Sequence, residues 1–399
     1  MKALRIAMVV PDFPRIGGYE RQAVALCHQL LTMGHKPYLV TNVRPGREYE
    51  PNYEGIELVA LSEAPKFRQH PFLFVRAFLQ HLKKRPVDCV HAHAMAPFSS
   101  AAIIAAKSRG IPTVLKLAGI GDEKVFRAHN DLNFRLARRG PLVAEKVVTL
   151  CNAMDRVAQS FGAEGTQMVR IPNGVYMGHA QDVSAESAFA LRKSLKIPDD
   201  HRIFLYVGRL SEEKGLRTLF QAVLPILKSE HRRTLVVVGD GPMRAELESM
   251  CQGYPVKMVG FQKKPAFYYR MADLFLLPSH EEGMSNALLE AMAVGLPIVA
   301  TDVGAAGEML GRHYPLVRPK DELDFRVAVE NMEARLAAGE PVGQSLLERC
   351  RNNFSLDQVA SRYVELYRSL SNPVVSEKTA IGWLTLLKQL KGTLLESES

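Results

Sequence analysis

The sequence lacks both a cysteine framework and a long apolar run. Its five cysteines are odd in number, lie far apart and include no Cys-x-x-Cys pair, which indicates neither a disulfide scaffold nor a zinc site. The longest nearly apolar stretch, residues 291–300, contains a glycine and a proline and is much shorter than the roughly 20 residues that cross a bilayer. We therefore expect a cytoplasmic protein with no transmembrane helix.

Acidic residues are scarce relative to basic ones only in the first half of the chain. The formal net charge is +9, and the basic excess lies in residues 1–180. A basic half suits nucleic acid, an anionic membrane surface or an anionic small molecule, and charge alone does not choose between them. A nucleic-acid-binding module and aromatic residues interleaved with basic ones are both missing from the sequence, so we expect no nucleic-acid partner.

The composition, with 47% hydrophobic and 23% charged residues, is that of a globular protein with a large core. In the first half of the chain, short β-rich runs alternate with helical stretches such as residues 20–33 and 72–84. This alternation predicts a doubly wound parallel sheet. The predicted strands are residues 4–10, 38–41, 56–61, 87–91, 113–117, 146–150 and 168–171.

A polar stretch then separates this half from a second pattern of the same kind. Pro172-Asn173-Gly174 is a turn signal, and the strands restart at residues 203–207. We therefore predict an α/β fold with two Rossmann-like, doubly wound domains. The predicted parts are a first domain at residues 1–178, a second at 179–355, a helix at 356–372 that packs back on the first domain, and a tail at 373–399 with the pattern of a further helix.

In an open α/β sheet, ligands bind beyond the carboxyl ends of the strands, so the loops that follow strands are the candidate sites. The first such loop contains Gly17 and Gly18 and opens a helix, where free amides and the helix dipole favour a phosphate. A Gly-Gly turn alone is more often only a tight turn, and the dinucleotide fingerprint is missing. The loop after residues 203–207 carries Arg209 and Lys214, a forked donor and a point charge that can converge on a diphosphate.

The most specific pattern is Glu282-x7-Glu290, which follows a predicted strand at residues 274–277 and enters a helix. Ser285 is an acceptable N-cap for that helix, so the amides of residues 283–286 would lie between the two carboxylates. Because the neighbours of Glu290 are apolar, we expect this carboxylate to be held among partners, and ligand hydroxyls are suitable ones.

Two histidines, His91 and His93, end another predicted strand. A metal-binding pair would need a third ligand, and no other cluster in the sequence supplies one. A structural role for both histidines stays open, but at the carboxyl end of a strand His93 would point into the same cleft as the loops.

Together, these motifs resemble the retaining glycosyltransferases of the GT-B fold, family four. The resemblance covers residues 4 to about 370 and rests on the order and spacing of the motifs. It implies two Rossmann-like domains that face each other across a cleft, the first on the acceptor side and the second binding a nucleotide-sugar. The motifs are Gly17-Gly18-x-Glu20, His93, Gly208-Arg209-x4-Lys214-Gly215, Gly239-Asp240-Gly241-Pro242, and Glu282-x7-Glu290 followed by Ala291-Met292-Ala293-x-Gly295-x-Pro297.

The resemblance also implies roles for residues of the second domain. Arg209 and Lys214 would contact the diphosphate, and Glu290 would contact the ribose hydroxyls. The donor sugar would meet the first carboxylate of the pair and the residues directly after it. These residues are Glu282, Gly283, Met284 and Ser285.

From the first domain, the resemblance implies that Gly17 and Gly18 approach the diphosphate and that His93 lies beside the donor sugar. Cations in such a site stabilise a leaving diphosphate, and carboxylates orient the sugar as positive charge develops at its anomeric carbon. Same-face attack, in which the leaving phosphate takes the acceptor proton, then needs no protein nucleophile. The candidate catalytic residues are Glu282, His93, Arg209 and Lys214.

The sequence departs from the family pattern in one place. Many relatives carry a His-Gly pair after the fifth strand, where this chain has Leu117-Ala118-Gly119, and this affects the acceptor-side contacts. No Asp-x-Asp motif occurs, which agrees with chemistry that needs no metal or other cofactor.

The segment Phe72–Arg85 is apolar with a cationic end. With nearby arginines it could rest on an anionic leaflet, which would place the protein peripherally on the inner face of the cytoplasmic membrane. Alternatively, its apolar residues belong to a helix that covers the sheet, with cations at the helix C-terminus where they are favoured.

These observations predict a hexosyltransferase that moves a sugar from a nucleotide-diphosphate donor to a glycan or lipid-linked acceptor. Among the possible donors, we expect a UDP-sugar. The expected setting is polysaccharide or lipopolysaccharide biosynthesis. A nucleotide-sugar epimerase or phosphorylase built on the same architecture stays an alternative, because fold alone does not fix function. A basic nucleic-acid-binding protein is a second alternative.

Overall fold

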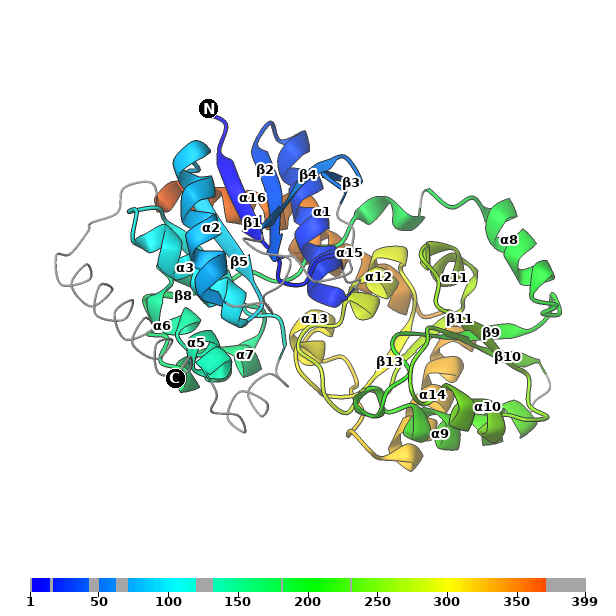
Figure 1. Cartoon of the computed structure of the whole chain (residues 1–399). Helices are drawn as coiled ribbons and strands as arrows, with labels where there is room; N and C mark the ends of the chain where they lie inside the picture. Colours follow the sequence, from blue (N-terminus) through cyan, green and yellow to red (C-terminus); the bar gives the residue numbers. More distant parts are fainter. Residues whose placement is uncertain are drawn as a thin grey trace. The chain divides into compact units, whose positions relative to one another are not determined.

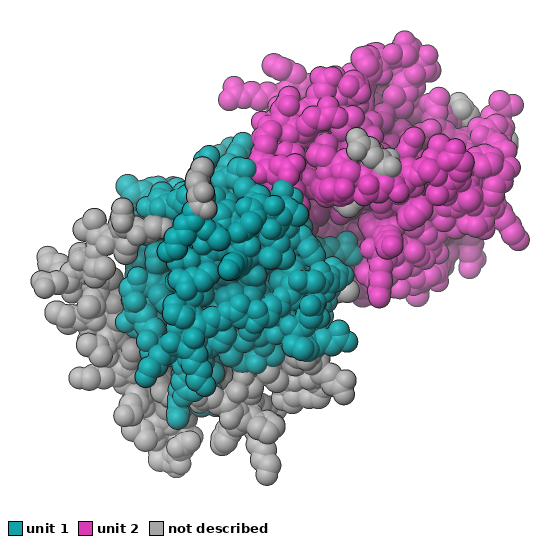
Figure 2. Space-filling model, turned by 90° about the horizontal axis from the view of Figure 1, so that it is seen from above, with its two compact units in different colours: residues 1–172, 359–399 teal, residues 173–358 magenta. Residues whose placement is uncertain are grey.

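The computed structural model describes residues 2–14, 17–42, 50–61, 71–119, 132–180, 182–229 and 232–370 (Figure 1). The chain divides into two compact units: unit 1 contains residues 1–172 and 359–399, and unit 2 contains residues 173–358 (Figure 2). Each unit has its own sheet and its own hydrophobic core. Among the described helices, none is long and apolar enough to cross a membrane.

Unit 1 is built on a sheet with the strand order β3-β4-β2-β1-β5-β6-β7-β8. Neighbouring strands pair in parallel, except that β3 and β4 are antiparallel. The chain starts in the middle of the sheet, builds outward through β2, and resumes on the other side of β1 at β5. The strands are β1 (Arg5–Val9), β2 (Lys36–Asn42), β3 (Asn52–Tyr53), β4 (Ile56–Leu61), β5 (Cys89–His93), β6 (Thr113–Lys116), β7 (Lys146–Thr149) and β8 (Met168–Arg170).

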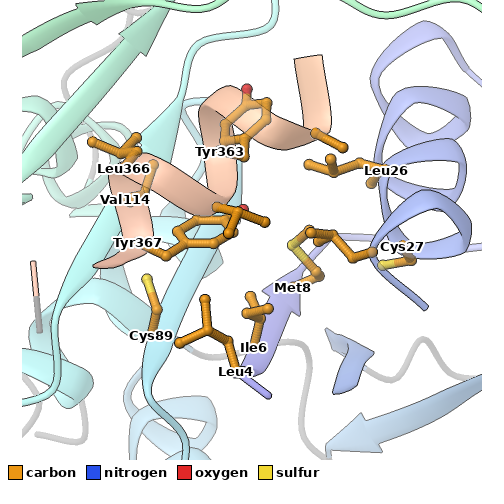
Figure 3. Close-up of a cluster of buried hydrophobic side chains, with 14 of the residues drawn as sticks. Leu4, Ile6, Met8, Leu26, Cys27, Cys89, Val114, Tyr363, Leu366 and Tyr367 are labelled. Atoms are coloured by element: carbon orange, nitrogen blue, oxygen red, sulfur yellow. The ribbon is translucent and has the colours of Figure 1, made fainter. Parts of the chain in front are cut away.

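Two helices that are far apart in the sequence cover one face of the unit 1 sheet. Ile6 and Met8 of β1 join one cluster with Leu26 of α1 and Tyr363 of α16 (Figure 3). Because alternate side chains of a strand point to the same face, α1 and α16 cover the same face of the sheet. The described helices of unit 1 are α1 (Gly18–Thr32), α2 (Pro71–Lys84), α3 (Pro97–Lys107), α5 (Leu132–Ala137), α6 (Gly140–Val143), α7 (Asn152–Ser160) and most of α16 (Leu356–Ser369).

Helix α16 brings the end of the described chain back to unit 1. Val359, Tyr363 and Tyr367 recur every four residues, so they share one face of the helix, and all three are buried in the core of unit 1. The sequence predicts a helix over residues 356–372 in this place, and α16 ends at Ser369. The predicted tail at 373–399 lies outside the described residues.

Helix α2 contains the apolar segment for which membrane contact is an alternative. Phe74, Phe78 and Leu82 are buried in unit 1, which is the arrangement of a helix that covers a sheet. At its cationic end, the Arg85 guanidinium lies 3.9 Å from the centre of the Tyr38 ring and forms an ion pair with Glu57. The described apolar side chains of α2 therefore serve the core.

Unit 2 contains a parallel sheet with the strand order β11-β10-β9-β12-β13. Its first strand is central, and the order reverses between β9 and β12, as in a mononucleotide-binding half of a Rossmann fold. The strands are β9 (Arg202–Val207), β10 (Arg233–Val238), β11 (Val256–Gly260), β12 (Leu274–Leu277) and β13 (Ile298–Ala300).

Helix α9 shows how the sequence forms the core of unit 2. Its Leu216, Leu219, Phe220, Val223 and Leu227 recur at three- and four-residue intervals, and all are buried in one cluster with β9, β10 and β12. Fully burying each such side chain contributes roughly 1.5–3 kcal/mol. The other helical elements of unit 2 are η1 (Met177–Ala180), α8 (Ala185–Ser194), η2 (Glu212–Lys214), α10 (Arg244–Met250), α11 (Ala266–Met271), α12 (Asn286–Val294), α13 (Ala306–Leu310), α14 (Glu322–Ala337) and α15 (Val342–Phe354).

The boundary between the units lies between Pro172 and Asn173, before the predicted boundary at residue 178. The reason is a pair of backbone hydrogen bonds. The Val175 amide donates to the Phe354 carbonyl, and the Leu356 amide donates to the Val175 carbonyl, both at 2.9 Å. These bonds tie the segment after Pro172 to the end of α15.

Candidate functional site

The switch point of the unit 2 sheet gathers the polar loops of that unit. It lies between β9 and β12, which are neighbours in the sheet but not in the sequence. The loop after β9 contains Arg209 and Lys214, and the loop after β12 contains Glu282. Because parallel strands end at one edge of a sheet, both loops lie at the place where ligands of open α/β sheets bind.

Close backbone packing holds these loops together. Gly215 ends η2 with φ +67, and a Cβ at this position would lie 2.0 Å from the carbonyl oxygen of Pro278 in the loop after β12. A side chain would therefore meet both a left-handed backbone and a clash. In the same way, a Cβ at Gly239, after β10, would lie 1.8 Å from the Gly208 carbonyl oxygen. The glycines of the sequence motifs thus let three strand-end loops touch.

Lys214 and Glu282 form an ion pair across these loops. Lys214 Nζ lies 2.7 Å from Glu282 Oε1, and the side chains are only 23% and 12% exposed. The Ser279 hydroxyl donates to the same carboxylate oxygen at 3.1 Å. Partial shielding from water strengthens such a pair relative to one on an open surface. The structure therefore brings Lys214, predicted to bind the diphosphate, into direct contact with Glu282, predicted to bind the donor sugar.

Arg209 differs from Lys214 in its surroundings. Its side chain is exposed, and among the described residues no carboxylate lies within ion-pair distance of it. Its backbone is fixed, because the hydroxyl of buried Tyr206 donates to the Arg209 carbonyl at 2.9 Å. The site thus contains one cation that is already paired and one that is available to an incoming anion.

Glu213 stabilises the loop between these two cations. Its backbone carbonyl accepts from the His280 amide at 2.8 Å and from the Glu281 amide at 3.2 Å. Its carboxylate accepts from the Ser211 hydroxyl at 2.5 Å. Burial would raise the pKa of Glu213, but this hydrogen bond and the nearby cations outweigh it and lower the pKa. The carboxylate therefore stays ionised and holds Ser211 within the loop, while the backbone carbonyl joins this loop to the one after β12.

Helix α12 starts directly after this loop, as predicted. Ser285 is its N-cap and accepts from the Leu288 amide at 3.3 Å. Met284 and Ser285 are buried, whereas Glu290 is half-buried within the first turns of the helix. The sulfur of Met284 accepts from the Asn173 amide at 3.2 Å, so Met284 also anchors the start of unit 2.

The loop after β13 supports the segment from Glu282 to Met284 from behind. The Ala305 amide donates to the Gly283 carbonyl at 2.9 Å. Gly304 has φ +56, and a Cβ there would lie 2.2 Å from the Glu282 carbonyl oxygen. The backbone of Glu282 and Gly283 is therefore fixed on both sides.

In unit 1, Gly17 and Gly18 lie where the sequence places them. Gly17 is the N-cap of α1 and Gly18 is the first residue of the helix. Glu20 follows in the first turn of the helix and is buried. Its carboxylate lies so close to Gly17 that a Cβ at Gly17 would be 2.4 Å from the Glu20 Oε2 atom. An acidic side chain thus already occupies the helix end that the sequence offers to a phosphate, and an anion there would have to share it.

His93 is the last residue of β5, next to the switch point of the unit 1 sheet between β1 and β5. Its ring is fully buried and stacks on His91 at 4.3 Å between centres. Burial lowers the pKa of both histidines well below the ordinary value, so both are neutral near pH 7. Among the described residues, no group of three or more histidine, cysteine or acidic side chains could hold a metal ion.

The sequence prediction missed two residues of these sites. Ser279 was overlooked because nothing in a serine's sequence context marks it as a partner of Glu282. Lys116, the last residue of β6, is buried, and burial lowers its pKa to about 7. The available signal was a lysine within the apolar strand pattern at residues 113–117.

Comparison with known proteins adds two family matches. A family model described as "Glycosyltransferase Family 4" matches residues 16–177. A second, described as "Glycosyl transferases group 1", matches residues 201–334. The first match lies almost entirely in unit 1 and the second lies in unit 2, so each unit matches one of the two family models.

Individual proteins are similar over most of the chain. TuaC of Bacillus subtilis, a glycosyltransferase named for teichuronic acid biosynthesis, is 29% identical over 350 residues, which covers 85% of this chain and 86% of that protein. The alpha-monoglucosyldiacylglycerol synthase of Acholeplasma laidlawii is 24% identical and covers 72% of this chain and 77% of its own. The structure of Anabaena HepE in complex with UDP superimposes with a TM-score of 0.75 at 18% identity, covering 92% of this chain and 100% of that one.

Proposed function

Because this chain belongs to the group 1, family four glycosyltransferases and has their GT-B fold, we propose that it is a retaining enzyme with a UDP-sugar as donor. It is a nucleotide-sugar-dependent hexosyltransferase. The proposed acceptor is a glycan or a lipid-linked glycan in polysaccharide or lipopolysaccharide assembly. The observation that carries the proposal is the Lys214–Glu282 pair at the switch point of unit 2, beside the exposed Arg209.

In the proposed donor site, Arg209 and Lys214 bind the diphosphate and stabilise the negative charge that develops as it leaves. The Arg209 guanidinium presents a fork of donors that matches phosphate oxygens, and Lys214 acts as a point charge. Glu290, which lies on α12, binds the ribose hydroxyls. Glu290 is half-buried, so part of its carboxylate is accessible to a ligand.

Glu282 and the backbone of Gly283, Met284 and Ser285 would hold the donor sugar. Glu282 is oriented by Lys214 and Ser279, so it is fixed before a ligand arrives. A positioned carboxylate favours the positive charge that develops at the anomeric carbon. Same-face attack, with the leaving phosphate accepting the proton of the acceptor hydroxyl, then needs no nucleophilic side chain and no metal ion.

Unit 1 would supply the remaining contacts. Gly17 and Gly18 give the backbone of α1 a close approach to the diphosphate, which would share this helix end with the Glu20 carboxylate. Neutral His93 supplies a ring nitrogen beside the donor sugar. Within the described parts of the chain, neither ring nitrogen of His93 has a hydrogen-bond partner, which supports this role because a buried nitrogen without a partner is available to a ligand.

The names of similar proteins support the acceptor class and the donor base. One relative is named for teichuronic acid biosynthesis and another for a glucosyldiacylglycerol, which are a polymer and a lipid. A structural neighbour was solved with UDP. A cytoplasmic site of action would place the enzyme where nucleotide-sugars are available. Contact with an anionic membrane stays a prediction, and flotation with anionic liposomes at low and high salt would test it.

A thermal-shift panel tests the donor proposal. UDP, GDP, ADP and their common sugar conjugates would be compared, since a ligand at about 100 times its dissociation constant adds roughly 2.7 kcal/mol of stability. We expect a shift with UDP that is lost in Arg209→Ala. A shift with another base alone would replace UDP as the donor base, and no shift with any nucleotide would reject the site.

The retaining outcome needs a separate measurement. Proton NMR of the first product formed from an α-configured UDP-sugar would show its anomeric configuration directly. We expect an α-linked product, and an initial β-linked product would overturn the same-face mechanism while leaving the donor site in place.

A further inference from the structure

The carboxyl ends of β5 and β6 in unit 1 hold a cluster of basic and phenolic side chains. His93 and Lys116 end these neighbouring strands and are register partners. The His93 ring stacks on His91 at 4.3 Å, and the His91 ring lies 5.1 Å from the ring of Tyr363. Lys116 Nζ lies 5.8 Å from the centre of the same Tyr363 ring. The four side chains therefore form one group at one edge of the sheet.

Several polar atoms of this group have no partner. Among the described residues, both ring nitrogens of His93 and the hydroxyl of Tyr363 are buried without a hydrogen bond. By contrast, His91 Nδ1 lies 2.7 Å from the Tyr367 hydroxyl, deeper in the core. Leaving a buried polar group unpaired costs about 1–3 kcal/mol. Such a cost in several neighbouring side chains marks a place that an additional group would complete.

Lys116 adds an uncompensated positive charge to the group. It is 3% exposed, and burial alone lowers its pKa to about 7, with no carboxylate among the described residues acting on it. The other titratable groups packed around it on β5 and α16 are neutral or basic, and they are His91, His93, Tyr363 and Tyr367. A buried ammonium without a counter-ion is costly, and an anion would offset that cost.

We propose that Lys116, with the Tyr363 hydroxyl and the His93 ring beside it, binds an acidic group of the acceptor, either a carboxylate or a phosphate. The inference rests on the proposed function, because it places the acceptor at the sheet edge of unit 1. It narrows the substrate class to anionic acceptors. The ammonium, the phenol and one imidazole N–H supply donors to the anion, and the charge-assisted hydrogen bond from Lys116 is the strongest of them.

Two probes whose charge is constant near neutral pH test the proposal. Glucuronate represents a carboxylate and sulfate represents a phosphate-like oxyanion, and each is titrated calorimetrically into the full chain at constant ionic strength set with chloride. The parent protein carries Arg209→Ala, so that the exposed cation of unit 2 does not compete. We expect Lys116→Met to weaken binding of at least one probe about tenfold or more, the scale of one hydrogen bond to a charged group.

Lys146→Met is the matched control. Lys146 is the first residue of the neighbouring strand β7, so it lies at the amino ends of the strands, away from Lys116. Its Nζ donates to the Thr166 carbonyl at 2.7 Å. It should leave both affinities unchanged, whereas Lys116→Arg should retain part of the binding. Without any substitution at Lys116, probe affinity should also fall as the pH rises through about 7, where the ammonium loses its proton. A fall in affinity over this range would support Lys116 as the binding group even where Lys116→Met fails to fold.

The outcomes separate this inference from the proposed function. Absence of binding of both probes to the parent, or equal binding by Lys116→Met, overturns the anion site. UDP binding, measured with Arg209 intact, should be the same in Lys116→Met and the wild type. If the wild type did not bind UDP, the donor proposal for unit 2 would be rejected, and the probe titrations would still report on the anion site.

Discussion

The two units present the same kind of sheet edge but treat their charged side chains differently. In unit 2, Lys214 and Glu282 satisfy each other and Ser279 adds a further bond. In unit 1, the groups around Lys116 include buried polar atoms that find no partner among the described residues. A site whose groups already pair is pre-organised for one ligand geometry. A site with unmet donors instead depends on a ligand for its compensation, which agrees with the different ligands proposed for the two units.

Breaking the pair in unit 2 should have the largest effect. Lys214→Met removes a cation from the proposed diphosphate site and frees Glu282, and we expect kcat to fall about 100- to 1,000-fold, the loss typical of a removed charge-stabilising donor. Steady-state release of UDP from a UDP-sugar measures it. Arg217→Met is the control, because Arg217 pairs with Glu246 on an exposed surface of the same unit. An equal loss in both variants would contradict a specific role for Lys214.

The two carboxylates of unit 2 should separate binding from turnover. We expect Glu290→Ala to weaken UDP binding about tenfold or more, because it removes hydrogen bonds to a charged group. Glu282→Ala should lower kcat more than it weakens UDP binding, since its partner is the sugar. Calorimetry with UDP and turnover assays on both variants measure the two effects. Wild-type turnover in both would reject the assignment.

A glycine substitution tests whether loop packing in unit 2 is needed for its pre-organised site. Gly215 and Gly110 both have φ +67, but a Cβ at Gly215 would clash with the Pro278 carbonyl, whereas a Cβ at Gly110 in unit 1 would meet nothing within 4 Å. Gly110→Ala should cost about 1–2 kcal/mol, the price of left-handed backbone strain. Gly215→Ala should cost more and also impair UDP binding. Chemical denaturation of both variants measures the difference, and equal costs would show that the loops are not tightly packed.

A pH dependence of stability is expected in unit 1. The pKa of Lys116 is lowered to about 7 in the folded chain from 10.5, so the unfolded state binds more protons between these values. Stability should therefore rise with pH across this window. Lys116→Met should lack this gain, so its stability relative to the wild type should decline as pH rises from about 7. Thermal melts of both proteins over this range test it, and parallel curves would show that Lys116 keeps its ordinary pKa.

Much of the fold follows from local patterns in the sequence. The runs at residues 4–10 and 203–207 become β1 and β9, because apolar strands between helical stretches have few other ways to be buried. The short antiparallel pair of β3 and β4 was not predicted, since two residues in β3 carry too little periodicity. The unit boundary also differed, because the hydrogen bonds of Val175 join segments that are remote in the sequence.

The sequence predicts which residues lie in the strand-end loops but not which of them make contact. Glycine motifs and the spacing of Glu282 and Glu290 identified the loops. The pairing of Lys214 with Glu282 joins loops that only the order of β9 and β12 brings together. Lys116 was missed for a different reason: a lysine in a strand pattern is usually solvent-exposed, and only the covering helix α16 makes it buried.

Hydrogen–deuterium exchange of the full chain with and without saturating UDP tests the central claim most directly. If the nucleotide binds at the carboxyl ends of β9 and β12, UDP should slow exchange in residues 208–215 and 279–286, and Arg209→Ala should abolish this protection. Protection that appears elsewhere in the described chain, with these two loops unchanged, would contradict the account.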